Sequence, residues 1–151
     1  MHISARVDYA MRALVVMATE PEVRMTCDRL AGAQSIPPRF LEGILTGLRR
    51  AGIVASHRGV DGGYMLARPP ETVSVADVIR ALDGPLAEVR GLRPEQSHYT
   101  GPVEPLQTVW IAARASLRSV LDHVTVADIA TGKLPRGVMK LAAAPDSWQS
   151  R

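Results

Sequence analysis

The side chains that could do chemistry in this chain are mainly arginines, and several of them gather between residues 39 and 59. An arginine can donate two hydrogen bonds to a guanine edge, a glutamate can accept one from a cytosine amino group, and other polar groups can contact phosphates. The candidate positions for such contacts are Arg39, Glu42, Gly43, Thr46, Arg50, Arg58 and Gly59. These residue types favour recognition of double-stranded DNA over catalysis.

Arginine is also unevenly distributed along the chain. Residues 1–68 contain nine arginines and no lysine against six acidic residues, whereas basic and acidic residues balance over residues 69–151. An excess of arginine in one part of a protein suggests a polyanionic partner, because guanidinium groups match phosphate geometry. Most polar helix faces are simply solvated, so the elements around these arginines must decide between the two interpretations.

Three short helices are predicted in the first third of the chain. Apolar residues recur at helical spacing from Ile3 to Ala18 with Ser4 placed to cap the start, and Thr26 is placed to cap a second helix ending near residue 33. A third helix should begin at prolines 37 and 38, because proline suits a first helical turn. Its expected apolar face comprises Phe40, Leu41, Ile44, Leu45 and Leu48. The opposite face then carries the candidate DNA-contacting positions of this helix, which are Arg39, Glu42, Gly43, Thr46 and Arg50.

A β-hairpin is predicted directly after the third helix. Apolar runs at residues 53–56 and 64–67 flank a turn containing Asp61 and Gly62, and an Asp-Gly pair in this context is a strong hairpin signal. Ser74 and Asp77 form a capping signature for a further helix that ends at Gly84. Three helices followed by a hairpin are typical of a winged helix-turn-helix domain. The predicted fold class is mainly α with a small β-hairpin.

Two glycines interrupt the third helix. Gly43 and Gly47 each destabilise a helix interior by about 1 kcal/mol relative to alanine, so a close approach should justify them. The approaching surface can be DNA or a neighbouring helix, and the sequence leaves both possibilities open.

The chain is predicted to divide into four parts. Residues 1–84 form the winged helix-turn-helix domain, residues 85–105 a linker or sensor segment rich in proline and glycine, residues 106–132 a dimerisation helix and a short helix, and residues 133–151 a tail. Apolar residues spaced four and three apart mark the seam of a coiled coil. The seam positions are Leu106, Trp110, Ala113, Leu117, Val120 and Val124. They predict a homodimer paired through this helix.

Two stretches of the sequence resemble a known family. The run FLEGILTGLRRAGIV over residues 40–54 and the run RGVDGGYMLA over residues 58–67 are similar to the recognition helix and wing of the Rrf2 family of bacterial transcriptional regulators. The opening helix, the helix near residues 75–82 and the segment TVAD at residues 125–128 also resemble that family. The resemblance covers about residues 2–132.

The resemblance implies a homodimer with two winged-helix heads that binds a palindromic operator, most often as a repressor. It also implies that Arg39, Glu42 and Gly43 face bases and that Arg58 reaches the minor groove. Gly43 stands where relatives often carry a glutamine, so this chain lacks one base-reading amide. The binding mode need not change with that loss.

Cofactor expectations follow from the cysteines. Cluster-binding members of the family carry three cysteines in the stretch that corresponds to residues 86–105, because thiolates hold iron–sulfur clusters. This chain has none there, so no iron–sulfur cluster and no other cofactor are expected, and the signal is a small-molecule effector, a partner protein or nothing. The single cysteine, Cys27, is either a redox sensor at a helix start or a small packing residue. His98, Tyr99 and His123 lack the spacing of metal ligands, so no metal site is expected.

Several function classes have little support in the sequence. No paired carboxylates, nucleotide fingerprint or activated nucleophile are visible, so an enzyme is not expected. The longest apolar run, from Ala13 to Ala18, is too short to cross a membrane, and a chain with one cysteine suits the reducing cytoplasm. The alternative to a DNA-binding regulator is an interaction module controlled by an effector or a partner protein, with weak or lost DNA binding.

Overall fold

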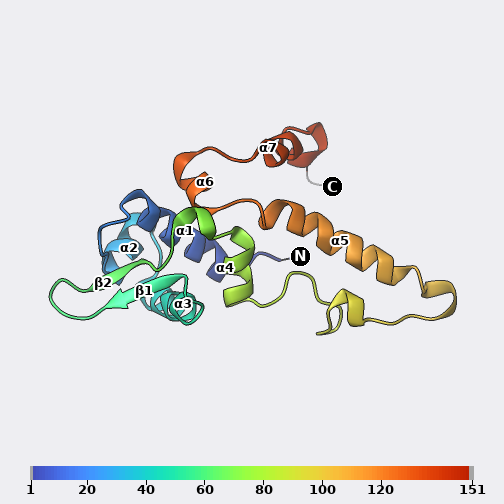
Figure 1. Cartoon of the computed structure of the whole chain (residues 1–151), viewed down its shortest axis with the longest axis horizontal. Coiled ribbons are helices and arrows are strands. Elements are labelled where there is room, and N and C mark those ends of the chain that lie inside the picture. Colours follow the sequence, from blue (N-terminus) through green and yellow to red (C-terminus); the bar gives the residue numbers. More distant parts are fainter. Residues whose placement is uncertain (1, 150–151) are drawn as a thin grey trace.

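A computed structural model describes residues 2–149, as a helical head from which one long helix extends (Figure 1). The head contains α1, α2, α3, the strands β1 and β2, and α4, while α5, α6 and α7 follow. Their bounds are α1 Ala5–Thr19, α2 Cys27–Gln34, α3 Pro38–Arg50, β1 Val54–His57, β2 Gly63–Leu66, α4 Val75–Leu82, α5 Leu106–Leu121, α6 Val126–Thr131 and α7 Arg136–Ala142. The predicted fold class, mainly α with a small β-hairpin, is confirmed.

The predicted helix starts agree with the structure. The Ser4 hydroxyl accepts a hydrogen bond from the Val7 amide over 3.2 Å, and the Thr26 hydroxyl accepts one from the Arg29 amide over 3.2 Å. Pro38 occupies the first turn of α3. Between α2 and α3 the chain turns at Ser35, whose φ of 52° is left-handed. These short-range features set up the helix-turn-helix.

The head has one apolar core to which α1, α3 and α4 contribute most. Val7, Ala10, Ala13, Leu14 and Met17 of α1 are buried, together with Leu41, Ile44, Leu45 and Leu48 of α3. Two sequence expectations were wrong here. Ile3 precedes α1 and is 56% exposed, so it does not belong to the buried stripe. Phe40 is 43% exposed because it lies to one side of the buried face of α3, where it packs edge-on against Tyr9.

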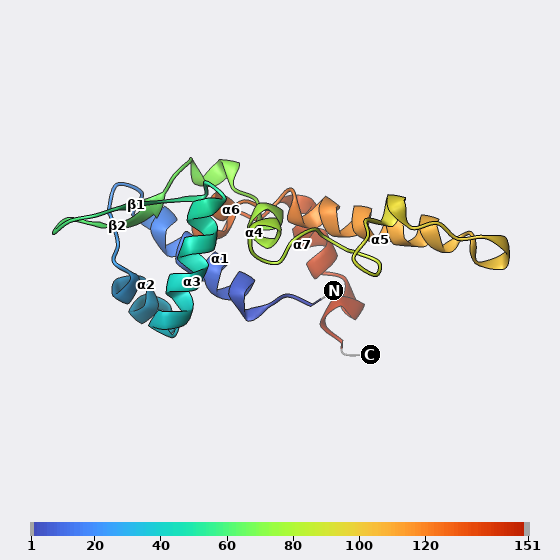
Figure 2. The same ribbon diagram turned by 90° about the horizontal axis from the view of Figure 1, so that it is seen from below.

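The hairpin is fixed to the segment before α2. Its strands pair antiparallel, with Ser56 opposite Tyr64, and Met25 and Tyr64 exchange backbone hydrogen bonds of 2.9 and 2.8 Å. A β-carbon on Gly63 would lie 2.8 Å from the Met25 carbonyl oxygen, so only glycine permits this approach. The hairpin projects from the end of the head that is remote from α5 (Figure 2).

The short helix α6 returns to the head. The Val75 amide donates to the Val124 carbonyl and the Val126 amide donates to the Val73 carbonyl, both over 2.9 Å. Val124 therefore lies after the end of α5 and is buried in its own chain. Its predicted place on the coiled-coil seam was wrong, because α5 ends at Leu121 and the chain turns back to pair with the segment before α4.

No residue of α5 is buried within the chain. The linker runs along one side of this helix and contains short 3-10 turns at Pro94–Gln96 and Gly101–Val103. Tyr99 accepts a hydrogen bond from the Trp110 indole over 3.1 Å, and Gln107 donates to the carbonyls of Pro94 and Glu95. None of the helices described is long and apolar enough to cross a membrane.

Candidate nucleic-acid interface

The polar face of α3 is open to solvent. Arg39, Glu42, Gly43 and Arg50 are exposed, on the side of the helix opposite the buried leucines. Thr46 lies among them and is half-buried, and its hydroxyl donates to the Glu42 carbonyl over 2.9 Å. The Thr46 hydroxyl can therefore only accept a further hydrogen bond, unless it gives up the one it makes within the helix.

Arg58 and Gly59 lie in the exposed turn of the hairpin. The turn is held by a hydrogen bond from the Gly62 amide to the Gly59 carbonyl over 2.9 Å. A β-carbon on Gly62 would meet the His57 carbonyl oxygen at 2.5 Å, so this position requires glycine. A tightly folded turn presents Arg58 outward beside α3.

An open cleft lies between the wing and the start of α2. Its lining includes Thr26, Cys27, Arg49, Ser56 and Arg58. The Arg49 guanidinium donates to the Ser56 hydroxyl over 3.2 Å and so connects the last turn of α3 to β1. Sequence reasoning missed Arg49, although it follows Glu42 by seven residues, which is close to two helical turns.

The arginines of this surface carry uncompensated charge. Over residues 2–149, the salt bridges involve Arg12, Arg29, Arg68, Arg80, Arg114 and Arg118. Arg39, Arg49, Arg50 and Arg58 belong to none of these pairs. A helix face and a hairpin that together present four guanidinium groups without an acidic partner are suited to a phosphate backbone and to guanine edges.

The two glycines of α3 have different surroundings. A β-carbon on Gly47 would lie 2.8 Å from Cδ2 of Leu82 on α4, whereas one on Gly43 would have no neighbour within 4 Å. Helix packing therefore accounts for Gly47. Gly43 lies on the open polar face, where it leaves room for a surface outside the chain.

Cys27 does not have the surroundings of a reactive thiol. It is half-buried at the start of α2, and its Sγ lies 3.7 Å from the Pro38 carbonyl oxygen. Burial raises the pKa of the Cys27 thiol, and the negative charges of Glu42 and Asp28 raise it further. A raised pKa disfavours the thiolate, so the packing interpretation is the better supported one.

The chain has one cysteine, and no group of three or more histidine, cysteine, aspartate or glutamate side chains within residues 2–149 could hold a metal ion. The donor set therefore does not fit an iron–sulfur cluster.

The predicted dimer seam forms one side of α5. Leu106, Trp110 and Ala113 are exposed, and Leu117 and Val120, which lie nearer the head, are half-buried. Gln107, Arg114 and Arg118 lie on a neighbouring side of the helix, which faces the linker. Trp110 also contacts the linker, because its indole donates to the Tyr99 hydroxyl over 3.1 Å, whereas Leu106 and Ala113 stay exposed in the described part of the chain.

Comparison with protein families and known proteins agrees with this surface. The model of the Rrf2 family, described as an iron-dependent transcriptional regulator, matches residues 3–132. An HTH-type transcriptional regulator of Mycobacterium tuberculosis is 51% identical over 143 residues, covering 94% of this chain and 89% of that protein. The HTH-type transcriptional regulator CymR of Bacillus subtilis is 31% identical, covering 87% of this chain and 91% of CymR.

Solved structures of such regulators have the same fold. The structure of B. subtilis CymR, the global cysteine regulator, superposes with a TM-score of 0.73 at 29% identity and covers 87% of this chain and 98% of CymR. T. potens IscR superposes with a TM-score of 0.70 at 29% identity, covering 93% and 96% of the two chains. The winged-helix head, the arginine surface and these matches together show that the chain belongs to the Rrf2 family of DNA-binding transcriptional regulators and is not an enzyme.

Proposed function

We propose that this regulator binds a palindromic operator as a homodimer and represses transcription by occupying promoter DNA. The observation that carries the proposal is the surface formed by α3 and the wing, where Arg39, Arg49, Arg50 and Arg58 have no acidic partner in the described structure. In this arrangement α3 enters the major groove and Arg58 reaches the adjacent minor groove. Glu42 and Arg39 then contact base edges, while Arg49 and Arg50 contact phosphates.

The exposed seam of α5 supports the homodimer. Leu106 and Trp110 are each 37% exposed and Val109 is 51% exposed, along a helix that projects away from the head. A second copy of the same helix would cover this apolar side through knobs-into-holes packing. Two heads related by a two-fold axis read two half-sites, so the operator is a palindrome.

The proposed regulator works in the cytoplasm without an iron–sulfur cluster. Its one cysteine lies in the winged-helix head and not in residues 86–105. Control of DNA binding then rests with a small-molecule effector or a partner protein.

A second function has one observation in its favour. Gly43 leaves the centre of the candidate recognition face without a side chain. A β-carbon added there would have no neighbour within 4 Å. A head without a side chain there has fewer base contacts, which favours an interaction module with weak or lost DNA binding.

The test is a selection of bound fragments from the host genome by the purified full chain, followed by a salt titration on the best fragment. An enriched palindrome bound with a Kd of about 10⁻⁸ M or tighter supports the proposed regulator. A shuffled version of the same fragment is the control. Uniform binding in the range of about 10⁻⁴ to 10⁻⁶ M, without enrichment, overturns the operator proposal and favours the interaction module.

A further inference from the structure

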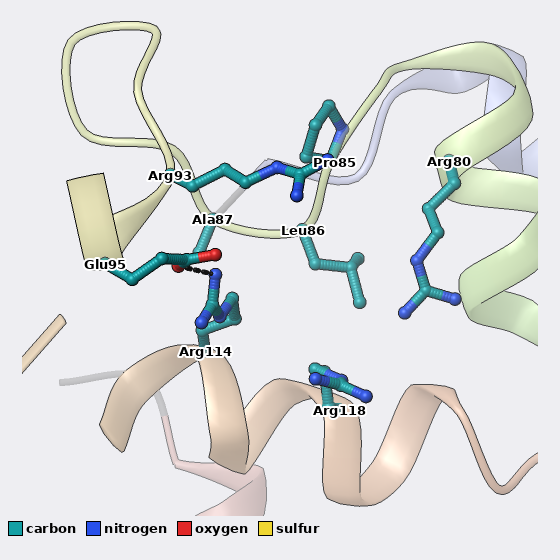
Figure 3. Close-up of a pocket in the computed structure, with 8 residues that line it drawn as sticks. All are labelled: Arg80, Pro85, Leu86, Ala87, Arg93, Glu95, Arg114 and Arg118. Carbon is teal, nitrogen blue, oxygen red and sulfur yellow. Dashed lines mark hydrogen bonds and ion pairs between the residues drawn. The ribbon is translucent and has the colours of Figure 1, made fainter. Parts of the chain in front are cut away.

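A second arginine cluster lies away from the DNA-facing surface, where α4, the linker and α5 meet. These elements enclose an open cleft of about 490 Å³ (Figure 3). Its polar lining consists of Arg80 from α4, Arg93 and Glu95 from the linker, and Arg114 and Arg118 from α5. Leu86 projects into the cleft between the arginines and forms part of an apolar wall.

The positive charge of this cleft is only partly neutralised. Arg114 is paired with Glu95, and Arg80 and Arg118 share Asp122 over 2.7 and 2.8 Å. Asp77 lies 3.6 Å from Arg80, but it is also paired with Arg68. Arg93 forms no salt bridge with any residue in the described part of the chain. The four arginines of the cleft are therefore balanced by two carboxylates, those of Glu95 and Asp122, which leaves an excess of about two positive charges.

The positions of Arg80 and Arg118 suit binding of an oxyanion. One carboxylate, that of Asp122, accepts hydrogen bonds from both guanidinium groups, one through each oxygen. Arg118 keeps 57% of its side chain exposed and Arg80 keeps 39%, so both retain unused N–H groups. A phosphate or carboxylate in the cleft could accept hydrogen bonds from these groups and from Arg93.

We propose that this cleft binds a small organic dianion, with its charged end among Arg80, Arg93 and Arg118 and its apolar part against Leu86. A phosphate monoester and a dicarboxylate share this chemistry, since both carry about two negative charges at neutral pH. The two charges of the ligand match the excess charge of the cleft. The apolar wall distinguishes an organic anion from inorganic phosphate.

Such a ligand would connect the head to the dimerisation helix. Arg80 belongs to α4, which packs on α3 through Leu82, whereas Arg118 belongs to α5. An anion held by both arginines stabilises one orientation of the head relative to α5 and therefore one spacing between two heads on DNA. This regulatory consequence rests on the proposed function, whereas binding of the anion does not.

The binding test titrates the full chain, without DNA, with phenyl phosphate or with phthalate. Binding is observed through the NMR chemical shifts of the backbone amides. We expect saturable shifts at residues 80–95 and 114–118, and the stronger of the two probes identifies the preferred anion. Benzyl alcohol, which is neutral, and potassium chloride at matched ionic strength are the controls. Shifts that follow potassium chloride, or that are as large at the wing as at the cleft, overturn the proposal.

A matched pair of variants tests the site itself. Arg93→Gln is expected to weaken phenyl phosphate binding at least about tenfold, because a charge-assisted hydrogen bond is lost. Arg90→Gln, an exposed arginine of the same linker outside the cleft, should bind with unchanged affinity. If the two variants bind phenyl phosphate with equal affinity, the proposed anion site is wrong. If Arg93→Gln changes subunit association in sedimentation and not anion binding, the cleft belongs to a subunit interface and the proposal fails.

The regulatory part has its own measurement. The Kd of the selected operator is measured by fluorescence anisotropy with and without saturating phenyl phosphate or phthalate, whichever binds. We expect a change of at least about threefold for the wild type and none for Arg93→Gln. If the operator Kd is unchanged when the cleft is saturated with the anion, the regulatory role is wrong, whereas the anion-binding site still stands. Failure to select any operator affects only the proposed function, because the NMR titration contains no DNA.

Discussion

A β-carbon on Gly47 would lie 2.8 Å from Cδ2 of Leu82, so α3 and α4 approach each other at a point where α3 has no side chain. Gly43, one turn earlier on the same helix, has open space around the corresponding position. Gly47 thus serves the packing of the head, whereas Gly43 lies on the face proposed to enter the major groove. Alanine at each position separates the two roles.

Gly43→Ala is expected to raise the free energy of unfolding by up to about 1 kcal/mol, because alanine favours the helix and meets no neighbour. Gly47→Ala gains the same propensity but must displace the buried Leu82 side chain, and overpacking destabilises by about 1–3 kcal/mol. Urea unfolding followed by circular dichroism should therefore rank Gly43→Ala above Gly47→Ala in stability. Equal stability of the two variants would contradict the close packing of α3 on α4.

Arg58→Ala is expected to weaken operator binding by about 1–3 kcal/mol, since the exposed guanidinium loses its contact with DNA. If that contact is to a phosphate, the slope of log K against log salt concentration should fall in magnitude by about one, because one counterion fewer is released on binding. Fluorescence anisotropy with the selected operator measures both. Arg136→Ala, an exposed arginine at the start of α7, is the matched control and should bind as the wild type does. Equal affinities for the two variants would reject a role for the wing.

Local sequence signals predicted the elements of the head well. Ser4, Thr26 and Ser74 cap helices as expected, because each cap is a hydrogen bond between residues three apart and needs no tertiary information. The hairpin followed from an Asp-Gly turn between apolar runs for the same reason. Short-range chemistry was therefore sufficient to recognise the fold class.

Features that depend on tertiary contacts were not accessible in this way. The spacing of Val124 continued the seam, but its burial comes from pairing with the segment before α4, which lies about 50 residues earlier in the sequence. Phe40 has the right residue type for a core position, yet it lies beside the buried face of α3 and not on it. The arginine cleft joins α4, the linker and α5, and periodicity within one element cannot reveal such a site.

Ala113→Glu is expected to convert the dimer to monomers, because a charge at the centre of the seam would be buried without a partner. Ala113 is exposed in the single chain, so the substitution should leave the fold intact. Ala112→Glu places the same charge on an adjacent exposed residue away from the seam and should remain dimeric. Sedimentation equilibrium distinguishes the two. A dimeric Ala113→Glu protein would show that α5 pairs through another side or not at all.

The stability of the protein is expected to fall with acid partly through Asp122. A hydrogen bond from Arg118 lowers the pKa of the Asp122 carboxyl, a further hydrogen bond from Arg80 lowers it more, and partial burial opposes both. Because the folded pKa is the lower one, this stabilisation is complete above the unfolded pKa of about 3.9 and is lost as the pH falls through the folded value. Urea midpoints between about pH 5 and pH 2 should therefore fall less steeply for Asp122→Asn than for the wild type. If the urea midpoints of the two proteins fell equally steeply with pH, Asp122 would not contribute to the loss of stability in acid.

Cys27 is expected to react slowly with iodoacetamide at neutral pH. Burial raises the pKa of its thiol, and Glu42 and Asp28 add to the effect, so little of the nucleophilic thiolate is present. Alkylation of the folded protein, followed by mass spectrometry, should be several-fold slower than alkylation of the same chain unfolded in urea. The unfolded chain is an internal control because Cys27 is the only cysteine in the sequence. A folded protein that reacts faster than the unfolded chain would contradict the packing role and would restore Cys27 as a redox sensor.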